Sequence, residues 1–141
     1  MNKIIISELR VRFGECDFYQ HVNNASYNNY FDIGITDFFK KVVYGEIYSK
    51  DTKKNVFVFH LVHANIDYKS SATFDDILVV STFLEKAGNS SITFKQEIRL
   101  KETEEILVTA KRVGVFLDSV TLKKITVPEE IRNYVHNPEA V

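Results

Sequence analysis

The chain has 141 residues, of which 45% are apolar, and a formal net charge of -1. This length favours one domain, residues 1–141, with enough apolar side chains for a real core. The near-neutral charge gives no reason to expect a nucleic acid or an anionic membrane as partner. One cysteine excludes a disulfide framework and any multi-cysteine metal site. No apolar run approaches the ~20 residues that cross a bilayer. The N-terminal apolar run is too short for a signal peptide, so we expect a cytoplasmic protein.

A first strand is predicted from Ile4 to Phe13, and a polar loop follows it. The segment from Asp17 to Asn24 holds a carboxylate, an imidazole and two adjacent carboxamides within eight residues. It stands directly before a predicted helix, at the end where backbone N–H groups are unpaired and the helix dipole is positive. This placement indicates a site that handles a developing negative charge.

A long helix is predicted from about Asn24 to Tyr44, which corresponds to ~30 Å at 1.5 Å per residue. Apolar residues recur along it at intervals of three and four, at Tyr27, Tyr30, Phe31, Gly34, Ile35, Phe38, Phe39 and Val42. Asn23 or Asn24 suits the N-cap, and Gly45 suits the C-terminal stop. Glycine in mid-helix costs up to ~1 kcal/mol relative to alanine, so we expect Gly34 to permit a close approach to a strand.

From Val56 the apolar pattern changes to a period of two residues, which is typical of strands. Four strands are predicted in a meander, over Val56–Tyr68, Ile77–Lys86, Ser90–Lys101 and Ile106–Leu117. The first has apolar residues on both faces, which favours a central strand covered on both sides. Its His60 and His63 lie three residues apart, so we expect them on opposite faces and predict no metal site. A charged loop is predicted over 50–55 and a turn of helix over Pro128–Val135.

These elements predict an α+β domain in which an antiparallel sheet of about five strands wraps around one long central helix. The helix must bury its apolar face, and the sheet is the surface available for it. One helix covers one side of such a sheet. Because the other side and the edges keep apolar residues and unpaired backbone groups, we expect self-association as a homodimer or homotetramer.

Two segments carry a resemblance to a known family. Val11–Asp32 contains Asp17 and, at fixed spacing, the run His21–Asn24 followed by Tyr27. Ile66–Leu78 contains an Asp-Tyr pair at a strand end, a short loop and an acidic start to the next strand. Together they resemble the acyl-CoA thioesterases of the 4-hydroxybenzoyl-CoA thioesterase family, which have the hotdog fold. The resemblance covers nearly the whole chain and implies a thioesterase without a cofactor.

The resemblance implies that Asp17 is the catalytic carboxylate. An ionised aspartate can attack the thioester carbonyl itself, or it can activate a water molecule for the attack; both routes stay open. The backbone N–H near Asn24 is the natural donor to the carbonyl oxygen. His21 is expected to brace the loop or to position the water or Asn24. The alternative role of Asp17 is to accept hydrogen bonds from loop N–H groups, as aspartates often do in turns.

The resemblance also suggests residues that bind the substrate, and these are Asn23, Tyr27, Asp32, Ser90 and Ser91. N-capping is the alternative role of Asn23, and hairpin polarity is that of the two serines, which stand where family members often contact CoA. Asp32, on the helix flank opposite the apolar stripe, is either a solvated or interface charge or a contact to the acyl group of a neighbouring subunit. Cys16 is not expected to be a nucleophile, because no histidine is placed as its base.

The sequence departs from the family pattern at two positions. Gln20 stands where a glycine often precedes the His-Val-Asn-Asn run, and Asn24 stands where some members carry His or Tyr. Two other functions remain open alongside the thioesterase. One is a hotdog hydratase or dehydratase in which His21 moves a proton, and the other is a non-catalytic module that binds acyl-CoA.

Overall fold

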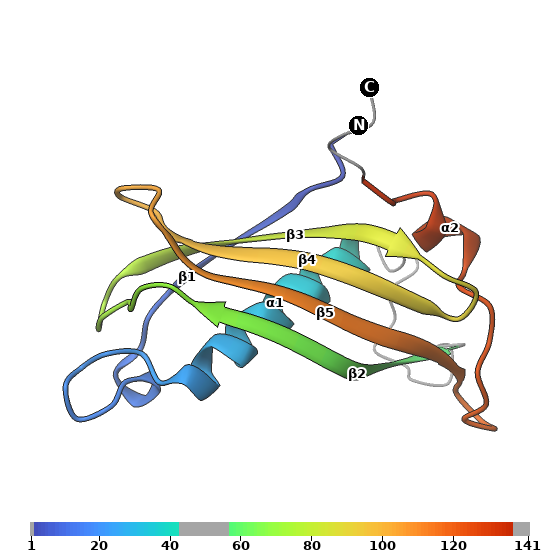
Figure 1. Ribbon diagram of the computed structural model, residues 1–141, viewed down its shortest axis with the longest axis horizontal. Helices are drawn as coiled ribbons and strands as arrows, with labels where there is room; N and C mark the ends of the chain where they lie inside the picture. Colours follow the sequence, from blue (N-terminus) through green and yellow to red (C-terminus); the bar gives the residue numbers. More distant parts are fainter. Residues whose placement is uncertain (1, 43–56, 137–141) are drawn as a thin grey trace.

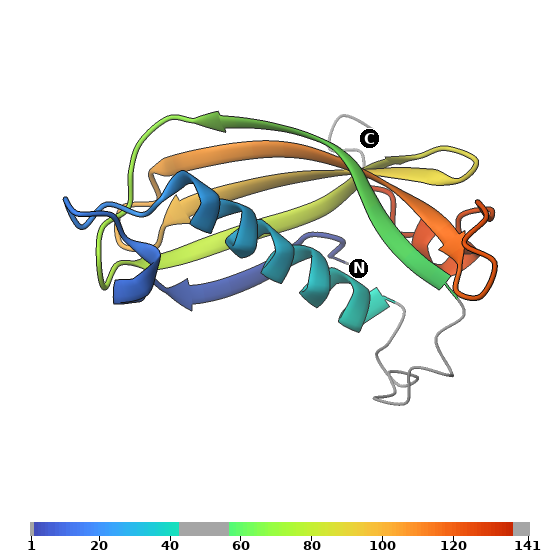
Figure 2. The ribbon, with the colours of Figure 1, turned by 90° about the horizontal axis from the view of Figure 1, so that it is seen from below.

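Five antiparallel strands form a curved sheet that wraps around one long helix (Figures 1 and 2). The computed structural model describes residues 2–42 and 57–136. Its elements are β1 (Ile5–Arg10), the short 3-10 helix η1 (Phe13–Glu15), α1 (Asn24–Val42), β2 (Phe57–Tyr68), β3 (Ile77–Ala87), β4 (Ser91–Leu100), β5 (Ile106–Asp118) and α2 (Glu129–Arg132). The strands lie in the order β1-β3-β4-β5-β2, and all neighbours are antiparallel. The predicted α+β architecture is confirmed.

Helix α1 lies against one face of the sheet with its apolar stripe turned toward the strands (Figure 2). The residues of the predicted stripe are buried except Val42, which is half-buried. The predicted start of the helix at Asn24 is confirmed. Its predicted end at Tyr44 and the stop at Gly45 lie outside the described residues, as does the predicted loop over 50–55. In the described ranges, no helix has both the length and the hydropathy needed to cross a membrane.

Gly34 lies where α1 comes closest to the sheet, as the sequence predicts. A Cβ atom at this position would overlap Thr82 Oγ1 of β3 and lie 2.8 Å from Gln96 Nε2 of β4. Gln96 Nε2 donates hydrogen bonds to the carbonyl oxygen of Phe31 and to Thr82 Oγ1, both at 2.9 Å. The missing side chain at Gly34 therefore sets the distance between the helix and these polar contacts.

The position of β2 differs from the prediction. Within the described sheet it pairs with β5 alone and forms an edge, so the expectation of a central strand is wrong. The meander consists of β3, β4 and β5. The link from β2 to β3, residues 69–76, crosses the end of the sheet instead of forming a hairpin: its Ala72 carbonyl accepts the N–H of Val22 at 3.0 Å. The apolar residues of β2 are therefore not all buried: Phe57 lies in the core, whereas Val62 is 56% exposed.

A β-bulge between Leu61 and His63 changes which side chains of β2 share a face. His60 pairs with Val115 and His63 pairs with Val113, two residues earlier on β5. Because side chains alternate with a period of two, both histidines lie on the same face. The prediction that they point to opposite faces is wrong. Among the described residues, no group of three or more His, Cys, Asp or Glu side chains could hold a metal ion.

Candidate active site

The segment between β1 and α1 folds back on itself before the helix begins. The N–H of Asn23 donates to the carbonyl of Glu15 at 2.9 Å, and the N–H of Asp17 donates to the carbonyl of His21 at 2.8 Å. Cys16 and Val22 form a bridge between these two contacts. This short ladder places Asp17 opposite His21 and ends at the residue before α1.

Gln20 makes the turn that closes this ladder. Its N–H donates to the carbonyl of Asp17 at 2.9 Å, and its φ of 65° lies in the left-handed region. Glycine adopts this conformation freely, whereas other residues lose ~1 kcal/mol or more. This explains why glycine suits the position before a His-Val-Asn-Asn run. The glutamine keeps the same turn at some cost in stability.

The Asp17 carboxylate is held through one of its two oxygens. Oδ1 accepts the N–H groups of Tyr19 at 2.9 Å and His21 at 3.1 Å. Oδ2 has no hydrogen-bond or ion-pair partner in the described ranges. The loop-bracing role considered for Asp17 thus describes Oδ1, while Oδ2 is available to another molecule. The side chain is exposed in the single chain, and it lines neither the cavity near Asp67 nor the one near Asp76.

The first turn of α1 offers unpaired backbone donors. The N–H of Ser26 donates to the carbonyl of Asn23 at 2.9 Å, whereas those of Asn24 and Ala25 have no acceptor among the described residues. The side chains of Asn23 and Asn24 are exposed and make no hydrogen bond with any described group. The expected N-capping bond is therefore not formed, which leaves these donors free for an incoming oxygen.

Glu15, which the sequence analysis did not single out, anchors the loop to the helix. Its Oε1 accepts the hydroxyl of Tyr30 at 2.9 Å and the N–H of Arg12 at 2.8 Å. Its Oε2 pairs with Arg12 Nη2 at 3.1 Å. Burial raises the pKa of Glu15, but the hydrogen bonds from Arg12 and Tyr30 and the guanidinium charge outweigh it, so the pKa is lowered. Burial and the bond to Glu15 raise the pKa of Tyr30. A polar hydroxyl within the buried stripe was the signal that such a partner exists.

Tyr27 and Cys16, two further residues of the first motif, are removed from solvent to different degrees: Tyr27 is buried and Cys16 is half-buried. Tyr27 is 1% exposed, and its hydroxyl oxygen accepts the N–H of Ala72 at 2.9 Å. Burial raises the pKa of Tyr27. Burial also raises the pKa of the Cys16 thiol, with the Asp17 carboxylate as the next cause. A raised pKa disfavours the thiolate, which is the nucleophilic form of cysteine.

Asp32 forms an ion pair with a residue that the sequence analysis missed. Its Oδ1 lies 2.7 Å from Arg112 Nη2 on β5, so the carboxylate is turned toward the sheet rather than away from it. The Arg112 side chain is 6% exposed and that of Asp32 is 54% exposed. Arg112 Nε and Nη1 are buried without a partner in the described ranges, as is Gln96 Oε1. A charged residue between Ala110 and Phe116 on an otherwise apolar face was the available signal.

Ser90 and Ser91 lie at the other end of the sheet from Asp17. The eleven residues of β3 separate the loop near Ala72 from their hairpin, a length of about 35 Å. Figure 2 shows the loop before α1 and the β3–β4 hairpin at opposite ends of the molecule. Their carbonyls take part in the sheet and the hairpin: that of Ser90 accepts the N–H of Phe116 on β5 at 2.9 Å, and that of Ser91 accepts the N–H of Gly88 at 2.8 Å. One chain therefore does not bring the serines to Asp17.

Comparison with known families decides the class of protein. Residues 11–135 match the Thioesterase-like superfamily. The match begins just after β1 and includes the loop ladder, α1 and strands β2 to β5. The chain belongs to this superfamily. It is a thioesterase, and the enzyme class implied by the resemblance is confirmed.

Individual thioesterases agree with this assignment. The long-chain acyl-CoA thioesterase FadM of Escherichia coli (strain K12) is 27% identical over 126 residues, which cover 89% of this chain and 92% of FadM. The solved structure of Slr0204, a 1,4-dihydroxy-2-naphthoyl-CoA thioesterase from Synechocystis, has a TM-score of 0.77 and 20% identity, and the match covers 94% and 95% of the two chains. The DHNA-CoA thioesterase of Staphylococcus aureus has a TM-score of 0.76 and 22% identity, covering 87% and 80%. These structures confirm the hotdog fold of our thioesterase.

Proposed function

We propose that this thioesterase hydrolyses an acyl-CoA thioester to the free acid and CoA, with Asp17 as the catalytic carboxylate. The observation that carries the proposal is that the loop holds only one of the two carboxylate oxygens of Asp17. Two backbone N–H groups hold Oδ1 of Asp17, while Oδ2 is free of described partners. The same ladder leads directly into a helix start whose N–H groups at Asn24 and Ala25 have no described acceptor. The likeness to FadM supports acyl-CoA as the substrate class.

This arrangement provides the two functions that thioester hydrolysis needs. Oδ2 of Asp17 either attacks the carbonyl carbon and forms an anhydride, which water then opens, or removes a proton from the attacking water. In both routes the carbon–sulfur bond breaks, and the CoA sulfur leaves as a thiolate that takes up a proton. The N–H groups of Asn24 and Ala25 would donate to the carbonyl oxygen as its charge develops, and the helix dipole adds to this effect.

We further propose that a second copy completes the site. Asp17 is exposed in the single chain, and the neighbouring Phe18 and Tyr19 are 93% and 77% exposed. Aromatic side chains this exposed, next to a reactive carboxylate, favour a state in which another protein surface covers them. Strand β2 is an edge with exposed Val58 and Val62, and an edge strand of this kind can pair with another strand. We therefore assign the homodimer contact to β2, either as the whole assembly or as half of a homotetramer.

The experiment is a thiol-release assay with a panel of acyl-CoA esters on wild type and on Asp17→Asn. The asparagine keeps an oxygen for the two loop N–H groups but loses the ionised oxygen, so turnover should fall by about 10²–10⁴-fold. Asp118→Asn is the matched control, because Asp118 Oδ1 also accepts two backbone N–H groups, from Val120 at 2.8 Å and Thr121 at 2.9 Å. The control should keep wild-type turnover.

The same panel separates the other two functions. A wild-type rate that survives Asp17→Asn would exclude the assigned role of this carboxylate. Hydration of an enoyl-CoA without thiol release, abolished by His21→Ala, would identify a hydratase. Binding of acyl-CoA without any turnover would identify the non-catalytic module.

A further inference from the structure

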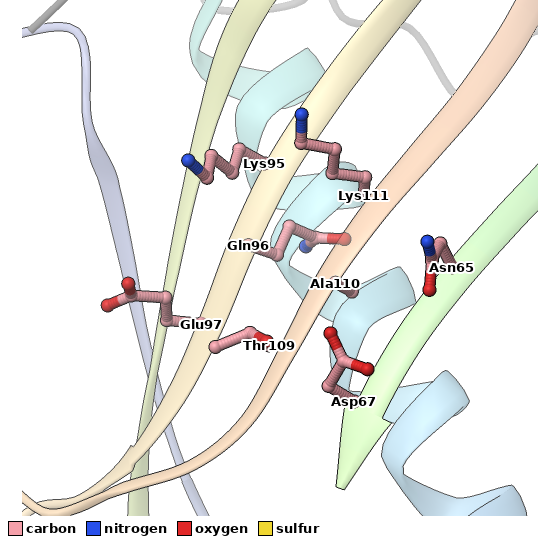
Figure 3. A pocket seen from close by; sticks show the side chains of 8 residues that line it. All are labelled: Asn65, Asp67, Lys95, Gln96, Glu97, Thr109, Ala110 and Lys111. Atoms are coloured by element: carbon pink, nitrogen blue, oxygen red, sulfur yellow. The ribbon is translucent and has the colours of Figure 1, made fainter.

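Asp67 and Tyr68 end strand β2, and the proposed function uses neither of them. Because side chains alternate along a strand, the two residues lie on opposite faces of the sheet. Asp67 lines a cavity of about 250 Å³ on the face turned away from α1, as Figure 3 shows. Tyr68 is the register partner of Val108, which is fully buried in the core beneath α1. The side chain of Tyr68 therefore lies on the same side of the sheet as α1.

The Tyr68 side chain reaches the first turn of α1. Its ring contacts that of Tyr27, with 5.9 Å between the ring centroids. Its hydroxyl oxygen lies 3.5 Å from the carbonyl oxygen of Asn24, the residue whose N–H has no acceptor among the described residues. The backbone that follows Tyr68 is held in place, because the N–H of Lys69 donates to the carbonyl of Leu107 at 2.8 Å. The end of β2 thus places a phenol group beside the helix start.

Packing explains the ring of Tyr68 but not its hydroxyl group. A phenylalanine would make the same ring contact with Tyr27. The 3.5 Å to the Asn24 carbonyl exceeds the length of an ordinary O–H···O bond, about 2.5–3.0 Å, so this contact holds the donor weakly. The hydroxyl of Tyr27, by contrast, is buried and accepts the N–H of Ala72 at 2.9 Å. Tyr68 is 44% exposed, so its hydroxyl is within reach of a bound molecule.

We propose that Tyr68 is a further catalytic residue of this thioesterase, and that its hydroxyl donates a hydrogen bond to the carbonyl oxygen of the thioester. The inference rests on the proposed function and adds a side-chain donor to the N–H groups of Asn24 and Ala25. The N and O atoms of one helical residue are about 3.5 Å apart, so the hydroxyl lies at most about 7 Å from the Asn24 nitrogen. One oxygen at about 3 Å from two donors bridges up to about 6 Å, which a small rotation of the exposed ring provides.

The hydroxyl supports both routes that are open to Asp17. When the carboxylate or an activated water attacks the carbonyl carbon, negative charge develops on the carbonyl oxygen. The Tyr68 O–H keeps its proton, and its hydrogen bond strengthens as this charge grows. It therefore stabilises the transition state more than the bound substrate. Because every acyl-CoA ester has this carbonyl, the effect should not depend on the acyl group.

The test is Tyr68→Phe, which removes the hydroxyl and keeps the ring contact with Tyr27. In the thiol-release assay, kcat should fall by about 10- to 100-fold for every ester in the panel, while KM stays within about two-fold. A thioether analogue of an acyl-CoA, which has no carbonyl oxygen, should bind wild type and variant equally well. Tyr134→Phe is the control and should keep wild-type turnover. Tyr134 packs its ring on Phe38 and follows α2, at the end of the molecule opposite the Asp17 loop (Figure 1).

Each outcome decides for or against this role. Full kcat in Tyr68→Phe would overturn it, and so would a loss confined to some esters, because the hydroxyl would then contact the acyl group. A lower midpoint of urea unfolding in Tyr68→Phe would assign the hydroxyl a structural role instead. Tyr27→Phe should lower that midpoint, because it leaves the N–H of Ala72 without its partner.

The same samples separate this inference from the proposed function. A wild type that releases no thiol from any ester would end both. A wild type that is inactivated by Asp17→Asn but keeps its kcat in Tyr68→Phe would leave the proposed function standing and refute the role of Tyr68 alone.

Discussion

Replacing Gly34 by alanine tests how closely α1 is packed on the sheet. Alanine is the better helix former, and in an exposed helix the change would stabilise the protein by up to ~1 kcal/mol. Here the new Cβ would overlap Thr82 Oγ1, lie 2.8 Å from Gln96 Nε2 and lie 3.1 Å from Val80 Cγ1. These three atoms belong to two strands of a sheet, so they cannot all move aside. The helix itself must shift or the strands must separate.

The expected loss follows from two destabilising contributions and one smaller gain. Overpacking a closely packed core costs typically ~1–3 kcal/mol. A shift that breaks the 2.9 Å bonds of Gln96 Nε2 to Phe31 and Thr82 leaves a buried donor without a partner, which costs about 1–3 kcal/mol. After the gain in helix propensity is subtracted, we expect the free energy of unfolding to fall by about 2–4 kcal/mol.

Urea unfolding followed by circular dichroism measures this loss. Gly14→Ala is the matched control, because a Cβ at Gly14 would meet nothing within 4 Å, and a change at such a site stays within about 0.5 kcal/mol. Combining Gly34→Ala with Thr82→Ala should cost less than the sum of the two single changes, since the overlapping oxygen is removed. A Gly34→Ala protein as stable as wild type would refute the role assigned to this glycine.

Three further changes test individual contacts. Gln20→Gly should raise the free energy of unfolding by up to ~1 kcal/mol, because it relieves the left-handed φ of 65°; a lower melting temperature would contradict this. Asp32→Ala leaves the buried Arg112 charge unpaired and should cost about 3–5 kcal/mol, whereas Arg112→Met should stay within ~1 kcal/mol, because the exposed Asp32 can be solvated; the reverse order in urea unfolding would exclude this reasoning. The lowered pKa of Glu15 means that its ionised form stabilises the fold above the ordinary value of 4.5. The stability difference between wild type and Glu15→Gln should therefore be full at neutral pH and shrink as the pH falls below 4.5; a difference that grows in acid would contradict the sign.

The helix and the loop before it could be predicted because their signals are local. The apolar stripe repeats over five turns of α1, and its burial follows directly from that repeat. The close approach at Gly34 followed from the cost of glycine within a helix. The ladder around Asp17 depends on residues within nine positions of one another, from Glu15 to Asn23. Only the structure shows that Oδ1 of Asp17 accepts the loop N–H groups while Oδ2 stays free of described partners.

The predictions that were wrong or incomplete concern features that depend on segments distant in the sequence. An apolar run such as β2 is compatible both with a central strand and with an edge strand that meets another chain. Only the pairing of β2 with β5 alone distinguishes the two. The bulge at Leu61 inserts one residue without any change in composition, so the shared face of His60 and His63 was not visible. The ion pair of Asp32 and Arg112 joins positions eighty residues apart. The sequence around each residue does not indicate which residue is its partner.

Two connections of the described chain explain why the candidate site lies at one end of the sheet. The connection from β1 to α1 and the one from β2 to β3 meet there: the carbonyl of Gln20 accepts the N–H of Phe74 at 3.1 Å, and His21 forms a bridge with Thr73. The Asp17 loop is therefore held on one side by its own ladder and on the other by the segment that follows β2. If a second copy pairs along β2 as proposed, the movement of that strand passes directly to Thr73 and the loop. Assembly and the orientation of the Asp17 carboxylate would then be coupled through backbone hydrogen bonds, and dilution that separates the copies should reduce turnover per chain.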